Sequence, residues 1–297
     1  MSKSLPALII FFLISSLGSS QIKNDLTFES SIGEAFEKYS VLRSNDPNEY
    51  VLGIVYFDAT AGMSFRYLGN LNAQDDDTLQ FEGIPNGMMI MRIESNWNKS
   101  HILSDDDVAV LKLEEDFVTS LSGLLKNYNP EKKDLKYKYD LGFAFNHSGD
   151  GNAALPYLME VHAEDPLYER LPFEIAFAYN ASGQYDKALK FIDSSDVIVT
   201  EDILLLKELN FAYANSDQID KSIKLYDELK SKDFEKELKA EIAFNIAGHY
   251  FRSLNRDEFL KWKKETNTYN NTQLDGILDQ LEAQLKIEIE KSTTGEN

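Results

Sequence analysis

The chain has 297 residues and no cysteine, and its 30 Lys plus Arg face 50 Asp plus Glu, for a formal net charge of −20. So negative a chain repels phosphate backbones and anionic lipid headgroups, which argues against nucleic-acid partners and against binding at a membrane surface. Without cysteines there is no disulfide framework, so packing alone must hold the fold together.

Residues 1–20, MSKSLPALIIFFLISSLGSS, have the pattern of a secretory signal peptide. Lys3 supplies the positive charge, residues 5–13 form a short apolar run, and Gly18 and Ser20 are small residues suited to cleavage. The run is shorter than the roughly 20 residues that span a bilayer. We therefore expect cleavage before Gln21, no stable membrane insertion afterwards, and an exported protein of the bacterial periplasm or the extracellular space.

Residues 21–100 are expected to form a small α+β subdomain. Residues 28–42 carry apolar side chains at helical spacing, whereas residues 63–71 alternate apolar and polar side chains as a half-buried strand does. Further strands are predicted over 50–57, 77–81 and 87–93. An alternative is a divergent half-repeat, in which residues 22–47 supply repeat-like helices and 50–57 are helical.

Residues 101–134 are expected to connect this subdomain to the rest of the chain through a helix. Ser104 and Asp107 have the spacing of a capping box, which marks a helix start. We expect that helix to run to about Asn127.

From residue 135 the sequence repeats with a period of 34. Phe143, Phe177 and Phe211 are spaced 34 residues apart. The neighbouring positions repeat in kind: an apolar residue, an aromatic four positions later, a turn residue, and a small residue (Leu141, Ile175, Leu209; Phe145, Tyr179, Tyr213; Gly149, Gly183, Asp217; Ala154, Ala188, Ser222). The glycines are expected to end a helix in the left-handed conformation, and Asp217 to cap the start of the next one.

This pattern resembles the tetratricopeptide repeat (TPR) family, exported bacterial type, over residues about 135–270. The family's Leu-Gly-x-x-Tyr, Ala-x-x-x-Phe and Pro are matched best by residues 141–166 and 175–192, although the opening Trp is absent from all three units. The resemblance implies a mainly α fold, a TPR-type α-solenoid over 135–292 that follows the small α+β subdomain. It has three clear helix-pair repeats.

A fourth, degenerate unit is expected after a three-residue slip, with Ile246 and Tyr250 in the repeat positions and Phe259 in place of the small residue. That bulk is expected to splay the helix pair. Residues 272–292 repeat Leu and Ile at spacings of three and four, so they are expected to form a C-terminal capping helix. Residues 293–297 are expected to be a disordered tail.

No catalytic motif accompanies the repeats. The sequence has no His-Glu-x-x-His, no Gly-x-Ser-x-Gly and only four scattered histidines, so we expect no enzyme, no cofactor and no metal site. Residues 149–154 fit the dinucleotide fingerprint Gly-x-Gly-x-x-Ala, but they follow a predicted helix, which favours an inter-helix turn. The acidic runs 75–77 and 105–107 lack the spacing of an EF-hand and favour a solvated loop and a helix start.

In the family, ligands bind the concave face lined by the first helix of each pair, and the matching positions here predict a partner-binding groove. Its predicted residues are Tyr139, Phe143, Asn146, His147, Arg170, Phe173, Phe177, Asn180, Lys207, Phe211 and Asn215, with Lys136 beside them and Phe244, Phe251 and Arg252 in the degenerate unit. The carboxylate clamp of chaperone-binding members is not reproduced, because aromatic residues stand where its first Asn would be.

These expectations favour an exported, non-catalytic scaffold that binds a protein or peptide of unknown identity. One alternative is a glycan- or surface-polymer-binding protein that uses the same aromatic residues against sugar rings. Another is that Phe143, Phe177 and Phe211 only pack between adjacent helices. Four Asn-x-Ser/Thr sequons, two of them at Asn146 and Asn180, favour a bacterial location, because glycans attached there would crowd the repeat helices.

Overall fold

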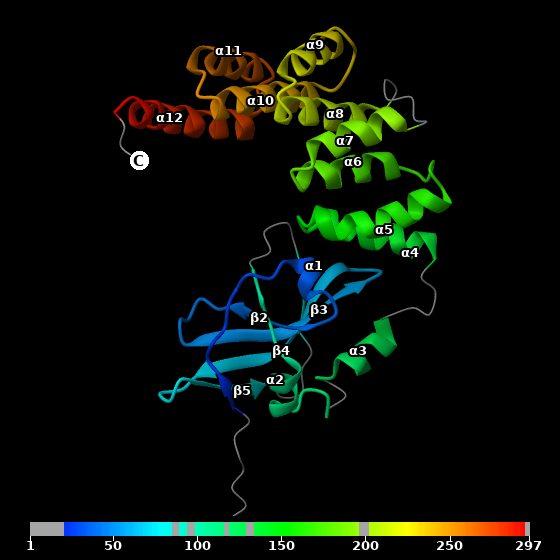
Figure 1. Cartoon of the computed structure of the whole chain (residues 1–297), viewed down its shortest axis with the longest axis vertical. Helices are drawn as coiled ribbons and strands as arrows, with labels where there is room; N and C mark the ends of the chain where they lie inside the picture. The colour runs from blue at the N-terminus through cyan, green and yellow to red at the C-terminus, as the bar shows by residue number, and fades with distance from the viewer. Residues whose placement is uncertain are drawn as a thin grey trace, which may run out of the picture.

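A computed structural model describes residues 21–84, 89–93, 99–115, 119–128, 134–195 and 202–294. An N-terminal sheet unit is followed by a curved stack of helices (Figure 1). The expected signal peptide lies outside the described residues, as do residues 295–297 of the expected tail. Thr293 and Thr294 belong to the last helix.

The N-terminal unit is a mainly antiparallel sheet. Its strands are β1 (Gln21–Lys23), β2 (Tyr39–Arg43), β3 (Glu49–Asp58), β4 (Gly62–Ala73), β5 (Thr78–Gly83), β6 (Met89–Arg92) and β7 (His101–Ile102). They are ordered β1-β5-β4-β3-β2-β7, and β6 pairs with β4 beyond the end of β5. The small sheet region is therefore confirmed, and the alternative of a helical 50–57 is wrong because these residues lie in the central strand β3.

The expected helix over 28–42 is also wrong. Only α1 (Ile32–Ala35) is helical, and it begins at a capping box between Ser31 and Glu34. Glu37 then takes a φ of 55°, and the chain turns into β2. The helical spacing of Ile32, Ala35, Phe36 and Tyr39 holds only for the first turn, because Tyr39 and Val41 alternate as strand residues and are buried on one face of the sheet.

The single connecting helix is wrong as well. The capping box of Ser104 and Asp107 is present, but α2 (Asp105–Val110) ends after six residues, Lys112 takes a φ of 57°, and α3 (Leu121–Tyr128) starts afresh. The break lets Leu111, Leu113 and Leu124 all pack on one face of the sheet.

The opposite face of the sheet packs on the first helices of the stack, α4 (Leu135–His147) and α5 (Gly151–Glu164). Val55, Phe57 and Phe65 of the sheet share one core with residues of these helices. The Phe57 ring lies 5.5 Å from that of Tyr137, and the backbone N–H of Gly33 donates to the Asp150 carboxylate at 3.0 Å. The sheet and the first helix pair are therefore one packed body.

The stack continues with α6 (Leu171–Ala181), α7 (Tyr185–Ser194), α8 (Ile203–Asn215), α9 (Ile219–Lys230), α10 (Lys236–Arg252), α11 (Arg256–Asn267) and α12 (Thr272–Thr294). Small residues let the paired helices approach as expected: a Cβ on Gly142 would lie 2.6 Å from Leu158. The fold is thus mainly helical, a solenoid of helix pairs after a small sheet.

Each pair turns through one residue in the left-handed conformation. Gly149 (φ 86°) and Gly183 (φ 70°) behave as predicted. Asp217 (φ 57°) occupies the same position and does not cap α9, which begins after Gln218 without a side-chain cap. Leu254 (φ 54°) fills this place in the fourth pair, so the turn geometry is kept where the glycine is lost.

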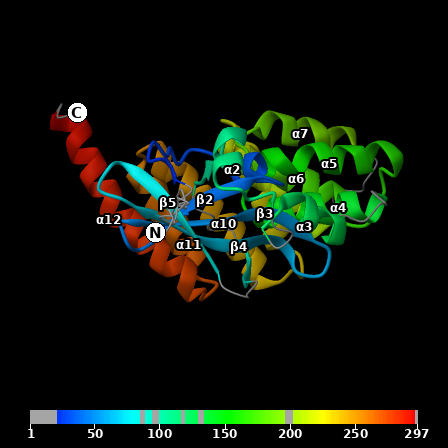
Figure 2. The same cartoon turned by 90° about the horizontal axis from the view of Figure 1, so that it is seen from below.

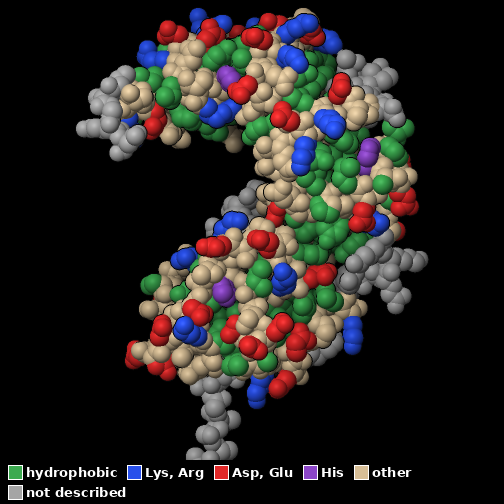
Figure 3. All heavy atoms as spheres, viewed as in Figure 1, with side chains coloured by type: hydrophobic (Ala, Val, Ile, Leu, Met, Phe, Trp, Pro, Cys, Tyr) green, Lys and Arg blue, Asp and Glu red, His purple; other side chains and the backbone are tan. Residues whose placement is uncertain are grey.

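The fourth pair accommodates its bulky residue. Phe259 is fully buried, with its ring 6.3 Å from that of Phe251, in the core that α8 to α12 share. Leu278 and Leu285 bury the apolar stripe of α12 in that same core. Figure 1 shows that the solenoid curves so that α10 and α12 lie across an open space from the sheet, and in Figure 2, seen from below, they overlap it. The surface in Figure 3 is hollowed there.

Candidate binding groove

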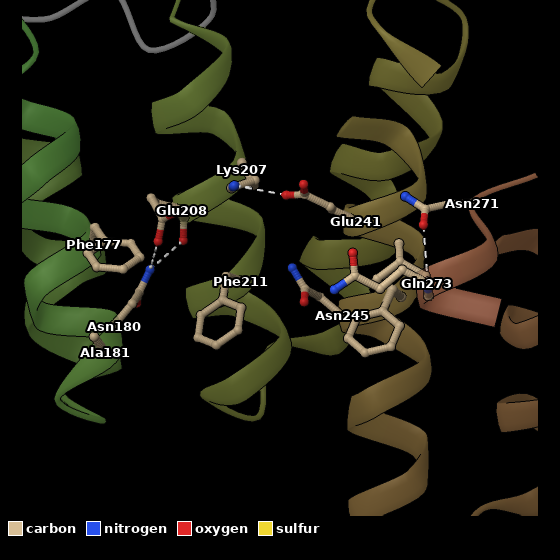
Figure 4. Close-up of a pocket in the computed structure, with 12 residues that line it drawn as sticks. Phe177, Asn180, Ala181, Lys207, Glu208, Phe211, Glu241, Asn245, Asn271 and Gln273 are labelled. Carbon is tan, nitrogen blue, oxygen red and sulfur yellow. Dashed lines mark hydrogen bonds and ion pairs between the residues drawn. The ribbon is translucent and has the colours of Figure 1, made fainter. Parts of the chain in front are cut away.

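A pocket of about 400 Å³ lies on the inner side of the arc, between α6, α8, α10 and the start of α12 (Figure 4). We call it the groove pocket. Its lining residues are Phe177, Asn180, Ala181, Lys207, Glu208, Phe211, Glu241, Phe244, Asn245, Asn271, Gln273 and Leu274. It brings together Phe177, Asn180, Lys207 and Phe211 of the predicted groove, together with Phe244 of the degenerate unit.

The pocket is built from recurring positions of successive helices. Phe177 and Phe211 are 34 residues apart, whereas Lys207 and Phe244 are 37 apart, because the fourth unit carries the three-residue slip. Phe177 and Phe211 share one repeat position, and Lys207 and Phe244 share a second one four residues earlier in the unit, since the extra residues lie before α10. The repeat therefore delivers aromatic side chains from α6, α8 and α10 to one place.

Asn180 is not a free groove donor. Only 4% of its surface is exposed, and its side-chain nitrogen donates to both the backbone oxygen and a carboxylate oxygen of Glu208, each at 2.9 Å. Asn146 makes the same pair of bonds to Glu174 one repeat earlier. The expectation that both asparagines are presented to a ligand is therefore corrected: they tie each first helix to the next.

Both glutamates of these pairs are buried, with Glu174 3% and Glu208 4% exposed. Burial raises the pKa of each carboxyl above its ordinary range, since a charged carboxylate loses hydration there. The side-chain oxygens of Asn146 and Asn180 are buried without a hydrogen-bond partner. The Asn-to-Glu spacing of 28 residues occurs in both units, and it is the sequence signal that would have revealed the pairs.

Charge at the pocket comes from one ion pair and one further carboxylate. The Lys207 ammonium lies 2.8 Å from a Glu241 carboxylate oxygen and bridges α8 to α10. Glu208, Glu241 and the polar residues Asn245, Asn271 and Gln273 were missed by the sequence reasoning. The last two belong to the loop before α12 and its first turn, which no repeat position specifies.

The remaining predicted residues lie elsewhere. Phe143 is 42% exposed on α4 and stacks on His147, with ring centroids 6.1 Å apart. The Tyr139 ring lies 4.9 Å from that of Tyr168, and burial, with a smaller contribution from the Glu174 carboxylate, raises the pKa of Tyr139 to about 12. These side chains continue an aromatic surface along α4 and do not line the groove pocket.

Phe173 and Arg170 lie beside the groove pocket, next to Phe177. The Phe173 ring lies 6.1 Å from that of Phe177, and the Arg170 guanidinium sits over Phe173 at 5.8 Å. Lys136 forms an ion pair with Asp140, a neighbour on its own helix.

The other three predicted residues, Asn215, Arg252 and Phe251, make their contacts within the helix stack. The Asn215 side chain donates to the Phe211 backbone oxygen at 2.7 Å, which ties it to its own helix. The Arg252 guanidinium donates to the Ala214 backbone oxygen at 3.4 Å, and burial lowers its pKa. Phe251 packs on Phe259.

Other kinds of site find little support in the described ranges. Gly149 lies in the turn between α4 and α5, and Gly151 is the first residue of α5. A Cβ on Gly151 would lie 2.5 Å from the Ala178 oxygen, so the nucleotide-like motif faces a packed helix. Within those ranges, no three His, Cys, Asp or Glu side chains are grouped to hold a metal ion. None of the described helices combines the length and the apolar character needed to cross a bilayer.

Comparisons with known proteins give a partial structural likeness. No family model matches the chain, and no curated protein matches it. Two solved structures from Podosopora anserina, described as a putative kinesin light chain with nearly identical TPR-like repeats, align in part. The first is 17% identical with a TM-score of 0.38, and the second is 18% identical with a TM-score of 0.37. Each alignment covers 57% of this chain and 87% of that chain.

Proposed function

We propose that this chain is an exported, non-catalytic scaffold that binds a protein or peptide segment in the groove pocket. The observation that carries the proposal is the pocket of about 400 Å³ lined by recurring positions on the first helices of three successive pairs, α6, α8 and α10. A solenoid of this kind presents an extended inner surface to which one continuous segment can bind.

The pocket supplies both interactions that a peptide needs. Phe177, Phe211 and Phe244 offer apolar surface on which a ligand's side chains can be buried. Asn245 and Gln273 make no side-chain hydrogen bond to another described residue, so their amides are available to a peptide backbone. We assign binding to the rings and the free amides, and structural support to Asn146 and Asn180.

Export is part of the proposal and rests on the composition of residues 1–20. Mass spectrometry of the protein recovered from the periplasm of a bacterial expression host tests it. We expect a mature N-terminus at Gln21; recovery of the uncleaved chain from the cytosol alone would contradict export.

Selection from a random 12-residue peptide library tests the binding function. The bait is the chain from residue 21, which contains every described element. We expect enriched peptides whose affinity drops at least about tenfold in Phe211→Ala, since burial of a large aromatic ring is lost. Phe143→Ala is the matched control, because Phe143 is more exposed and lies outside the pocket. It should leave affinity unchanged.

Two results would overturn the proposal. One is a library in which no peptide is enriched over the unselected pool. The other is binding on a glycan array that is lost in Phe177→Ala, which would assign the aromatic residues to sugar rings.

A further inference from the structure

Glu208 is a buried carboxylate without a cationic partner among the described residues. It is 4% exposed, its side chain is hydrogen-bonded by Asn180 alone, and the nearby Lys207 ammonium is engaged by Glu241 at 2.8 Å. Isolated buried charges are costly, and folded proteins ordinarily pair them. When Glu208 is ionised, its carboxylate and that of Glu241 face only Lys207, which leaves one negative charge in the groove pocket without a balancing cation.

The preceding repeat contains a natural comparison. Glu174 occupies the equivalent position and accepts the same bonds from Asn146, but the cationic or potentially cationic side chains that act on it are Arg170 and His147. At Glu208 the stabilising influence of Lys207 is opposed by the carboxylates of Glu241 and Glu174. Of these two repeat glutamates, only Glu208 lines the pocket. The hydrogen bonds from asparagine give both glutamates a structural role, whereas only Glu208 combines an unpaired carboxylate with a place in the pocket wall.

The surroundings of Glu208 suit a cation with an apolar stem. Phe177, Phe211 and Phe244 line the same pocket, and the face of a phenyl ring attracts an ammonium or guanidinium group. Figure 4 shows the carboxylate of Glu208 lying between Phe177 and Phe211 on the pocket wall. An arginine or lysine side chain can bury its methylenes against such rings while its head reaches the carboxylate.

From this arrangement we propose that the groove pocket selects a peptide with a basic side chain next to apolar residues, and that Glu208 is the counter-ion that specifies it. The inference rests on the proposed peptide-binding function and names its ligand class. The net charge of −20 agrees with it, because an acidic protein draws a basic segment by long-range attraction.

The test uses the enriched peptides and two matched variants. We expect Arg or Lys at one fixed position beside an apolar residue, and at least about tenfold weaker binding when that position is replaced by citrulline, which keeps the shape of arginine without its charge. Glu208→Gln should weaken binding to a similar degree. Glu174→Gln removes the equivalent buried carboxylate outside the pocket and should leave binding within about twofold of the parent chain.

The outcomes separate this inference from the proposed function. Enriched peptides without a basic residue, or equal binding by Glu208→Gln and the parent chain, would overturn the inference while peptide binding stands. A library with no enriched peptide would overturn both. Circular dichroism establishes that each variant is folded, and the citrulline substitution gives a readout that does not depend on any protein variant.

Discussion

The side-chain nitrogen of Asn180 lies 2.9 Å from the backbone oxygen and 2.9 Å from a carboxylate oxygen of Glu208, and it thereby joins α6 to α8. Asn146 joins α4 to α6 through Glu174 in the same way. The two pairs form a short ladder along the first helices of the repeats. The ladder stops after α8, because Ala214 occupies the next asparagine position.

Removing a rung of this ladder should destabilise the solenoid. We expect Asn180→Ala to lower the free energy of unfolding by about 1–3 kcal/mol, because a buried carbonyl and a buried carboxylate lose their donor. Urea denaturation followed by circular dichroism measures it. Asn245→Ala is the control, since Asn245 makes no side-chain bond to a described residue, and it should change stability by less than about 0.5 kcal/mol. Equal effects of the two changes would contradict the structural role of Asn180.

The buried glutamates should make stability depend on pH. Because their folded-state pKa is raised, the folded protein holds these protons more tightly than the unfolded chain. The resulting stabilisation is present below the unfolded carboxyl pKa, about 4.3, and is lost as pH rises through the higher folded value. Glu208→Gln keeps the acceptor for Asn180 and removes the titration.

We therefore expect Glu208→Gln to be more stable than the parent chain at pH 7 and to lose that advantage towards pH 4. Urea denaturation of both proteins at the two pH values measures the difference. A variant that is less stable than the parent at pH 7 would show that the carboxylate is compensated in the folded protein.

Neighbouring phenylalanines should differ in their contribution to stability. Phe145 is 1% exposed, so Phe145→Ala should cost about 3–5 kcal/mol, whereas Phe143→Ala, at 42% exposed, should cost less than about 1 kcal/mol. Phe177 is half-buried, so its replacement by Ala should fall between them. Thermal and urea unfolding of the three variants tests this order. A loss for Phe177→Ala as large as that for Phe145→Ala would favour packing alone over ligand binding.

Gly33 tests the junction of the sheet with the solenoid. A Cβ there would lie 2.4 Å from the Cβ of Ala153, so Gly33→Ala should cost about 1–3 kcal/mol through overpacking. Gly276→Ala is the matched control, because no atom lies within 4 Å of its added Cβ and it sits in α12, where alanine should stabilise by about 0.5–1 kcal/mol. Unfolding measured by tryptophan fluorescence and circular dichroism distinguishes the two signs. A neutral Gly33→Ala would mean that the junction is loosely packed.

The helix pairs that repeat every 34 residues could be predicted from the sequence, whereas the elements before the repeats could be predicted only in part. The turns predicted at Gly149 and Gly183 are confirmed. The 34-residue spacing of Phe177 and Phe211 places both rings at one pocket. Asp217 was misjudged because its usual role as a cap competes with its tolerance of the left-handed conformation.

The errors in the N-terminal unit have a different cause. Ile32, Ala35, Phe36 and Tyr39 have helical spacing, and only the pairing of β2 with β3 shows that Tyr39 lies in a strand. Likewise, the capping box at Ser104 marks where α2 begins but carries no information on where α2 ends. At the groove, Glu174 and Glu208 also follow the 34-residue period, but an acidic residue at a repeating position does not by itself predict a buried carboxylate.

The core shared by the sheet and α4–α5 has a practical consequence for dissecting the molecule. A repeat array needs its end faces covered to stay in solution, and here the sheet covers the N-terminal one. A fragment cut at the first repeat would expose Tyr137 and Phe145 to water, so the repeats alone are expected to aggregate. Fragments meant for crystallisation or interaction screening should therefore begin at residue 21.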